Sequence, residues 1–243
     1  MNDRSDPRYS GMGGLRTGTM DASRDEGLRS YMLKIYNYMA SAVLLTGIVA
    51  MLFAQSGYAA QIMAGGSPLA WIIMLSPLAI VFAMSFGMNR MSVGTLQILY
   101  WSFAVLMGLS MSTIFLVFTG TSIALTFFAT TGAFLGLSLY GYTTKRDLTA
   151  FGTFLIMGVV GLFVAMIANM FLQSGTLSLV ISFIGVLLFA GLTAYDTQKL
   201  KSMYYYIQDS DMMGKTVIMG ALTLYLDFIN MFQFLLSFLG SRE

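Results

Sequence analysis

Two aspartates interrupt long apolar stretches near the end of the chain, and they are the residues best placed to do chemistry. Asp227 lies within the stretch 216–240, and Asp196 lies within the preceding stretch, 177–198. A charge inside a membrane-spanning helix costs about 2.5–3.5 kcal/mol on insertion scales, so such residues usually face protein or a water-filled cavity and have a partner. Because two close carboxylates in a poorly solvated site cannot both ionise at low cost, we expect Asp196 and Asp227 to share a proton.

Three further residues are candidates to support or control this Asp pair. Asn230 lies three residues after Asp227, on the same helix face, where its amide can hold the carboxylate. Tyr195 directly precedes Asp196. Arg90, at the end of the second apolar stretch, either extends to the lipid headgroups or folds inward as a latch on the Asp pair, and the sequence favours the first reading. A purely structural role for the Asp pair, as a hydrogen-bonded clasp, is the alternative to a functional site, which we favour.

Seven apolar stretches are long enough to carry these residues across a membrane. Each has about the 20 apolar residues that a helix needs to span ~30 Å of hydrocarbon. With 57% hydrophobic and 10% charged residues, the composition is far from that of a soluble domain, in which about a quarter of residues are charged. The sequence therefore predicts an all-α membrane protein of seven transmembrane helices, at residues 31–54, 69–88, 93–118, 123–142, 151–172, 177–198 and 216–240.

The basic residues predict the orientation of this bundle. Twelve of the 13 Lys and Arg residues fall on one side of the predicted spans, and only Arg242 falls on the other. The positive-inside rule then places the N-terminus in the cytoplasm. Residues 1–28 lack an apolar period, so we expect a flexible cytoplasmic tail followed by a seven-helix transmembrane domain at 29–243.

Several classes of function are excluded or disfavoured by what the chain lacks. The absence of Cys and His removes thiolate and imidazole metal sites, cysteine nucleophiles and the usual general base. No Gly-rich phosphate loop is present, and the Lys145–Arg146 pair is too small for nucleic-acid binding. We therefore expect no enzyme activity, no cofactor and no tight metal site. The two carboxylates fall well short of the six to eight oxygens of a calcium site, so any Ca²⁺ near Asp196 and Asp227 is weakly or transiently bound.

Four segments resemble the Bax inhibitor-1 family of small seven-helix membrane proteins, and its bacterial branch in particular. They are residues 108–115 (GLSMSTIF), 144–148 (TKRDL), 194–198 (AYDTQ) and 224–230 (LYLDFIN), the last two being specific in combination. The resemblance implies six helices around a central seventh, with Asp196 and Asp227 as a proton-sharing pair. It further implies that this pair gates a slow, pH-sensitive calcium leak, with a basic residue at the position of Arg90 as a latch.

Three functions are compatible with these residues. The first is a proton-gated leak for calcium or another cation across the lipid bilayer. The second is a regulatory membrane protein that binds a membrane protease or acts in a stress response, as some bacterial members resemble modulators of such a protease. The third, an intramembrane aspartyl protease, is disfavoured because no Gly-x-Gly-Asp precedes the second carboxylate. We also expect the small-residue pair Gly132 and Gly136 to pack inside the bundle rather than in a dimer interface.

Overall fold

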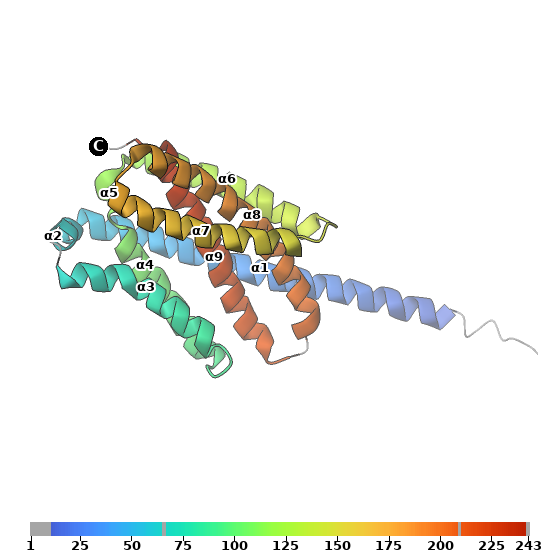
Figure 1. The fold of residues 1–243 in the computed structure, drawn as a ribbon. Helices are drawn as coiled ribbons and strands as arrows, with labels where there is room; N and C mark the ends of the chain where they lie inside the picture. Colours follow the sequence, from blue (N-terminus) through green and yellow to red (C-terminus); the bar gives the residue numbers. More distant parts are fainter. Residues whose placement is uncertain (1–10, 65–66, 209, 242–243) are drawn as a thin grey trace, which may run out of the picture.

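The structure is a computed structural model that describes residues 11–64, 67–208 and 210–241, with side chains described from residue 25 onward except at 63–64. Within these ranges the chain is helical and contains no strand. The helices, coloured in chain order in Figure 1, are α1 (Gly11–Gln55), α2 (Tyr58–Ala64), α3 (Pro68–Gly87), α4 (Val93–Met111), α5 (Ile114–Val117), α6 (Gly120–Thr143), α7 (Thr149–Leu172), α8 (Gly175–Ile207) and α9 (Met212–Leu239).

The predicted seven spans are confirmed. Within the described ranges, seven helical segments are long and apolar enough to cross a membrane, and they match the predicted ones in order and approximate position: Asp25–Gln55, Pro68–Gly87, Val93–Val117, Gly120–Thr143, Thr149–Leu172, Gly175–Ile207 and Met212–Leu239. The largest difference is at α8, which runs nine residues past the predicted end at residue 198. The flexible tail predicted for residues 1–28 stays a prediction. Residues 1–10 lie outside the described residues, and the rest of that range belongs to α1, which begins at Gly11.

Local sequence explains where the spans begin. A hydroxyl side chain precedes α3, α4, α6 and α8, and in each case it accepts a hydrogen bond from the backbone N–H three residues later. Such capping satisfies one of the N–H groups that the first turn of a helix leaves without a partner. The capping residues are Ser67, Ser92, Thr119 and Ser174.

The third span is broken near its end. Helix α4 ends at Met111 and α5 starts at Ile114, although no proline lies between them. The Ser112 hydroxyl donates to the carbonyl of Leu109 at 2.7 Å, and the backbone N–H of Phe115 bonds to Ser112 over three residues instead of four. Competition of this kind from a serine side chain commonly bends a helix.

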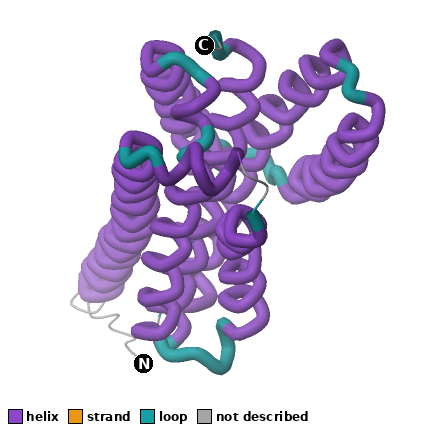
Figure 2. The backbone as a smooth tube through the Cα atoms, turned by 90° about the vertical axis from the view of Figure 1, so that its left-hand side faces the viewer, coloured by secondary structure: helices purple, strands orange, loops and turns teal. Residues whose placement is uncertain are grey.

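Helix α9 forms the centre of the bundle. It packs against α1, α4, α6 and α8, while α3 packs on α4 and α7 packs on α8 at the outside. The last helix therefore runs through the middle of the molecule, and it ends at the opposite end of the bundle from the one at which α1 enters (Figures 1 and 2). This arrangement agrees with the predicted central seventh helix.

Glycines set two of the closest helix contacts, but not the two that the sequence suggested. A Cβ added at Gly141 of α6 would lie 2.1 Å from the carbonyl oxygen of Ala194 on α8, so the two backbones touch there. At Gly108 of α4 the added atom would lie 2.8 Å from the carbonyl oxygen of Thr46 on α1. The prediction for Gly132 and Gly136 is wrong, because both are exposed and have nothing within 4 Å of an added Cβ.

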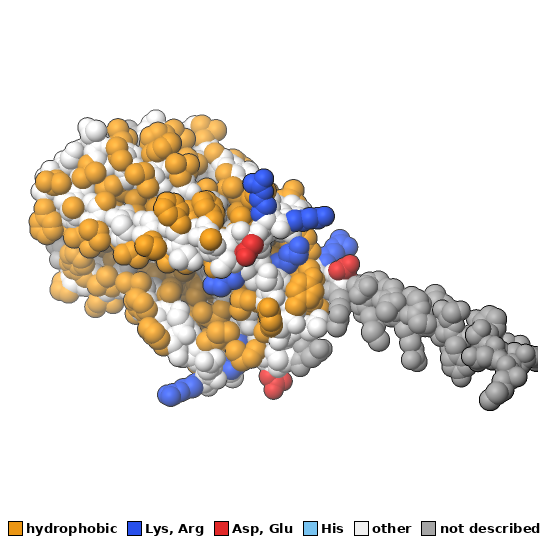
Figure 3. Space-filling model, turned by 45° about the vertical axis from the view of Figure 1, so that its right-hand side comes forward, with side chains coloured by type: hydrophobic (Ala, Val, Ile, Leu, Met, Phe, Trp, Pro, Cys, Tyr) orange, Lys and Arg blue, Asp and Glu red, His pale blue; other side chains and the backbone are white. Residues whose placement is uncertain are grey.

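The outer surface is apolar except at one end. Large hydrophobic side chains such as Phe86, Met170 and Phe171 are more than 70% exposed, as expected for residues that face lipid. On the face shown in Figure 3, hydrophobic side chains cover most of the body, and most of the visible Lys and Arg side chains gather at one end. Here the start of α9 meets the α3–α4 turn, where the Lys215 ammonium donates to the carbonyl of Asn89 at 3.3 Å. Which side of the membrane this basic end faces stays a prediction, and Arg242 lies outside the described residues.

Candidate functional site

The structure brings the two intramembrane aspartates together. Asp196 on α8 is 9% exposed and Asp227 on α9 is 4% exposed. The two carboxyl groups lie within hydrogen-bonding reach of each other. Because an ionised carboxylate can only accept hydrogen bonds, a bond between two carboxyl groups needs a proton on one of them. The arrangement can therefore hold one proton between two helices.

The helices place the Asp pair well inside the bundle. Asp227 lies 15 residues after the start of α9, about 22 Å along the helix axis. Helix α8 continues for about three turns beyond Asp196, so this residue lies about 16 Å from the end of the helix. The two depths differ by only about one helical turn, because α8 and α9 are antiparallel neighbours joined by a short connection at the basic end.

The polar surroundings of the Asp pair are sparse. One oxygen of Asp227, Oδ2, is buried and has no hydrogen-bond partner among the described residues. The nearest cation is Lys199, one helical turn after Asp196, whose ammonium acts on that carboxyl group from the solvent-facing side of α8. No group of three or more acidic, His or Cys side chains able to hold a metal occurs in the described part of the chain. The acidic side chains that meet at this site are therefore the two of the Asp pair.

Arg90 does not contact the Asp pair in this structure. It is exposed in the turn between α3 and α4, where its backbone N–H bonds to the carbonyl of Gly87 at 2.9 Å. Its guanidinium makes no ion pair with either aspartate. The geometry therefore matches the reading in which Arg90 extends toward the headgroups, and the latch stays a prediction that requires a movement of this turn.

The two predicted supporting residues point elsewhere. Asn230 does not bond to Asp227, because its amide donates to the carbonyl of Leu226 on its own helix at 2.8 Å. Tyr195 faces α7, where its ring fills the space that a Cβ at Gly152 would occupy. The structure therefore gives no support to the idea that Asn230 holds the carboxylate, and this role stays a prediction.

A buried polar contact two residues before Asp227 along α9 was missed from the sequence. The hydroxyl of Thr46 on α1 donates to the carbonyl of Ala104 on α4 at 2.9 Å, and it lies 2.8 Å from the hydroxyl of Tyr225 on α9. Since a threonine hydroxyl has one proton, Tyr225 is the donor in the second bond. This contact ties three helices together at a residue two positions before Asp227, and all of its members are buried.

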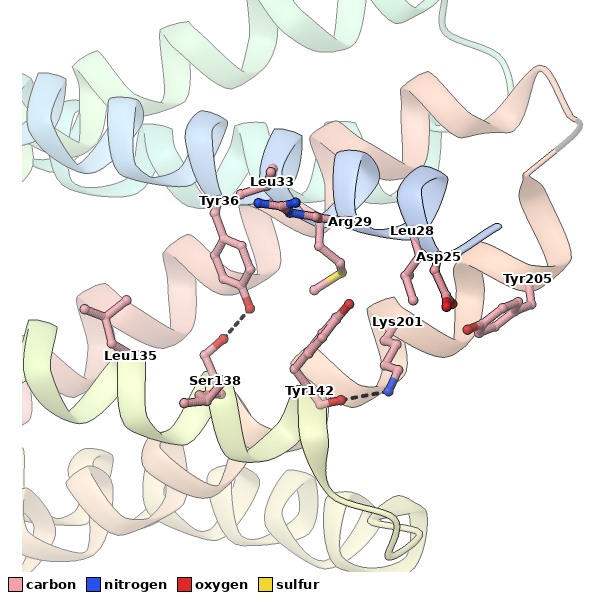
Figure 4. Close-up of a pocket in the computed structure, with 12 residues that line it drawn as sticks. Asp25, Leu28, Arg29, Leu33, Tyr36, Leu135, Ser138, Tyr142, Lys201 and Tyr205 are labelled. Carbon is pink, nitrogen blue, oxygen red and sulfur yellow. Dashed lines mark hydrogen bonds between the residues drawn. The ribbon is translucent and has the colours of Figure 1, made fainter. Parts of the chain in front are cut away.

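A second set of hydroxyl groups joins α1, α6 and α8 and ends at Thr197, the residue after Asp196. Tyr36 on α1 bonds to Ser138 on α6, and Ser138 lies 2.9 Å from the hydroxyl of Thr197 on α8, the residue after Asp196. Tyr36 and Ser138 also line a cavity between α1, α6 and α8 at the basic end, which is shown in Figure 4. Uncharged hydroxyl residues gave no signal in the sequence, although Thr197 belongs to a segment that was singled out.

Comparisons with known proteins agree with this architecture. A sequence model of the family described as Inhibitor of apoptosis-promoting Bax1 matches residues 28–243. A protein of Rickettsia prowazekii is 48% identical over 231 residues, which cover 94% of this chain and 97% of the relative. Inner membrane protein YbhL of Escherichia coli K12 is 43% identical over 219 residues, covering 89% of this chain and 94% of YbhL. A membrane protein of Streptococcus pyogenes is 32% identical over 221 residues, covering 90% and 96%.

Proposed function

The chain belongs to the Bax inhibitor-1 family of integral membrane proteins, and from this premise we propose that it is a pH-sensitive leak channel for calcium or another cation, gated by Asp196 and Asp227. We place it in a bacterial inner membrane, as the name of its E. coli relative indicates. The proposal involves no catalytic step and no cofactor, and the cation is the transported substrate.

The observation that carries the proposal is the close approach of two buried carboxyl groups inside an apolar bundle. A clasp that serves only stability is better made from neutral groups, and this protein has such a clasp at Thr46 and Tyr225. Ionisable side chains at membrane depth are costly and usually mark an ion or proton pathway. We therefore assign the Asp pair a role that requires its charge.

The proposed gate works by the gain and loss of one proton. While a proton is shared, the carboxyl groups hold α8 against α9, and their burial keeps the cation away. When the proton leaves, two negative charges face each other, and two unit charges about 4 Å apart repel by about 4 kcal/mol at an effective dielectric constant of about 20. This repulsion favours separation of the carboxylates, entry of water and attraction of a cation. Two carboxylates supply too few oxygens to hold Ca²⁺ firmly, which suits a leak.

The test is calcium flux into liposomes that contain the purified protein, measured between pH 5 and 8. The wild type is compared with Asp196→Asn and Asp227→Asn, which keep the shape and can still donate a hydrogen bond to the remaining carboxyl group but cannot titrate. The matched control is Asp147→Asn, the same change at an exposed residue between α6 and α7. We expect flux above that of empty liposomes, a pH dependence in the wild type and the control, and a reduced or absent pH dependence in the two gate variants.

Two results would contradict the proposal. If flux and its pH dependence are unchanged in both gate variants, the Asp pair is a structural clasp. If no preparation carries calcium or another cation above empty liposomes at any pH, the regulatory function takes its place. A membrane protease or other partner should then be recovered from native membranes with both gate variants.

A further inference from the structure

A lateral crevice opens between α1 and α6 at the basic end of the bundle. It has a volume of 700 Å³, and α8 forms its floor. Figure 4 shows side chains from the three helices arranged around it, with Tyr36 and Ser138 at one end and Tyr205 and Lys201 at the other. Its size lies within the 300–1,000 Å³ that is usual for small-molecule sites.

One part of the lateral crevice is apolar and open toward the lipid. Leu33 on α1 and Leu135 and Leu139 on α6 line it, and they are 49%, 60% and 63% exposed. All three lie within segments long enough to span the membrane. A hydrocarbon chain can therefore enter the crevice sideways from the bilayer without crossing a polar barrier.

The other part carries charge. The Lys201 ammonium donates to the carbonyl of Tyr142 at 2.7 Å and lies 4.8 Å from the centre of the Tyr142 ring. Arg29 also lines the crevice and acts electrostatically on Tyr142. It makes no ion pair with any described residue, and the acidic lining residue is Asp25. Two cations and one anion thus line this part of the crevice, and they leave it with a net charge of +1.

We propose that the lateral crevice binds a membrane phospholipid, with the phosphate at its charged part, which Arg29 and Lys201 line, and one acyl chain along the three leucines. The guanidinium fork of Arg29 matches two oxygens of a phosphate, and Lys201 supplies a second positive charge. Basic pockets between transmembrane helices are a common way to hold lipid headgroups. Free phosphate lacks the apolar part, and a neutral lipid lacks the charge, so the combination selects a phospholipid.

This site is separate from the proposed gate, and it does not depend on cation transport. It also differs from an ordinary accumulation of basic residues at the membrane edge. Lys199 belongs to that ordinary kind, because it is exposed two residues before Lys201 and lies outside the crevice, 5.9 Å from the ring centre of Tyr195. Lys199 therefore offers a matched control on the same helix.

The experiment is native mass spectrometry of the full-length protein in detergent, titrated with dioleoyl phosphatidylglycerol. Two further ligands separate the parts of the lipid: diolein has the chains without the phosphate, and glycerol 3-phosphate has the phosphate without the chains. The variants are Arg29→Gln, Lys201→Gln and Leu139→Trp, and the control is Lys199→Gln. Leu139→Trp narrows the crevice at an exposed position and leaves every charge in place, so it tests the site even if loss of the Lys201 bond disturbs folding. Thermal unfolding of each variant shows which ones are folded.

We expect phosphatidylglycerol to bind the wild type and Lys199→Gln alike, and to bind each of the three crevice variants roughly tenfold more weakly, since a charged hydrogen bond or the chain contact is lost. Diolein and glycerol 3-phosphate should both bind much more weakly than the phospholipid. The proposal is overturned if the folded crevice variants retain as much phosphatidylglycerol as Lys199→Gln does. It is overturned equally if diolein binds as well as the phospholipid, or if glycerol 3-phosphate does.

Discussion

A single methyl group added at Gly141 should push α6 away from α8, the helix that carries Asp196. In Gly141→Ala the new Cβ would lie 2.1 Å from the carbonyl oxygen of Ala194 and 2.9 Å from its carbonyl carbon and Cα. These are backbone atoms inside a 33-residue helix, so they cannot rotate away as a side chain would. Relief requires α6 and α8 to part by roughly 1 Å, which loosens the contacts along their interface.

Overpacking of this kind costs about 1–3 kcal/mol, and the upper part of that range is expected because the clash is with backbone. For a chain of this size each kcal/mol lowers the melting temperature by about 2–4 °C. We therefore expect Gly141→Ala to melt about 4–12 °C below the wild type in detergent, measured at one scan rate because unfolding of such proteins is often irreversible. Ala194 lies two residues before Asp196, so the same variant should also disturb the Asp pair and its pH-dependent flux.

The matched control is Gly136→Ala, the same change on the same helix at an exposed position with nothing within 4 Å. Alanine is the better helix former, so this variant should melt at or slightly above the wild-type temperature. If both variants melt at the same temperature as the wild type, α6 and α8 do not touch as described, and the reasoning from their close approach fails.

Three further outcomes follow from contacts at the basic end and from the absence of cysteine. Gln198→Ala removes the 2.8 Å bond from the Gln198 amide to the carbonyl of Arg146, in the loop between α6 and α7. Trypsin in detergent should therefore cut after Arg146 several-fold faster than in the wild type. An unchanged rate would show that this loop is held by other contacts. Because the chain has no Cys, Ser56→Cys and Arg146→Cys each introduce a single thiol that reports on which side of the membrane it lies. The predicted orientation places residue 56 outside the cytoplasm and residue 146 inside it, so in whole cells a membrane-impermeant maleimide should label only Ser56→Cys. The reverse labelling pattern would invert the predicted orientation. Hydrogen bonds from Thr149 hold the pKa of Asp147 below its usual range, so their contribution to stability is complete above the ordinary Asp pKa of about 3.9 and is lost as the pH falls through the lower folded-state pKa. The difference in melting temperature between the wild type and Asp147→Ala should therefore be present at pH 6 and shrink toward pH 2; a constant difference would mean that the charge of Asp147 plays no part.

The sequence was sufficient to predict the spans and the proximity of the two aspartates. A run of about 20 apolar residues is a strong signal because the membrane itself fixes the length. Asp196 and Asp227 were paired because few charges lie at membrane depth and each needs a partner. The structure places them together, while their role in gating stays a prediction.

The neutral polar contacts could not be predicted, for a physical reason. Hydroxyl groups such as those of Thr46 and Ser138 are inexpensive to bury when bonded, so they leave no mark in hydropathy, and their partners depend on how each helix is rotated. The same rotation explains why the prediction for Gly136 was wrong, since this residue lies on the outer face of α6. The role predicted for Asn230 also depends on side-chain geometry, and in this structure its amide bonds to a carbonyl on its own helix.

The position of α9 also has a consequence for how the protein is made. The helix at the centre of the bundle is synthesised after the six spans that surround it, so these spans enter the membrane without the surface around which they pack. During that interval Asp196 lacks the partner that α9 will bring, and the faces of α1, α4, α6 and α8 that later cover α9 are open. The centre of the bundle is therefore filled only after the surrounding spans have been made. A chain that stops before Met212 would keep the Asp196 carboxyl group at membrane depth without its partner. Cellular quality control could recognise this unpaired polar group as a mark of incomplete folding.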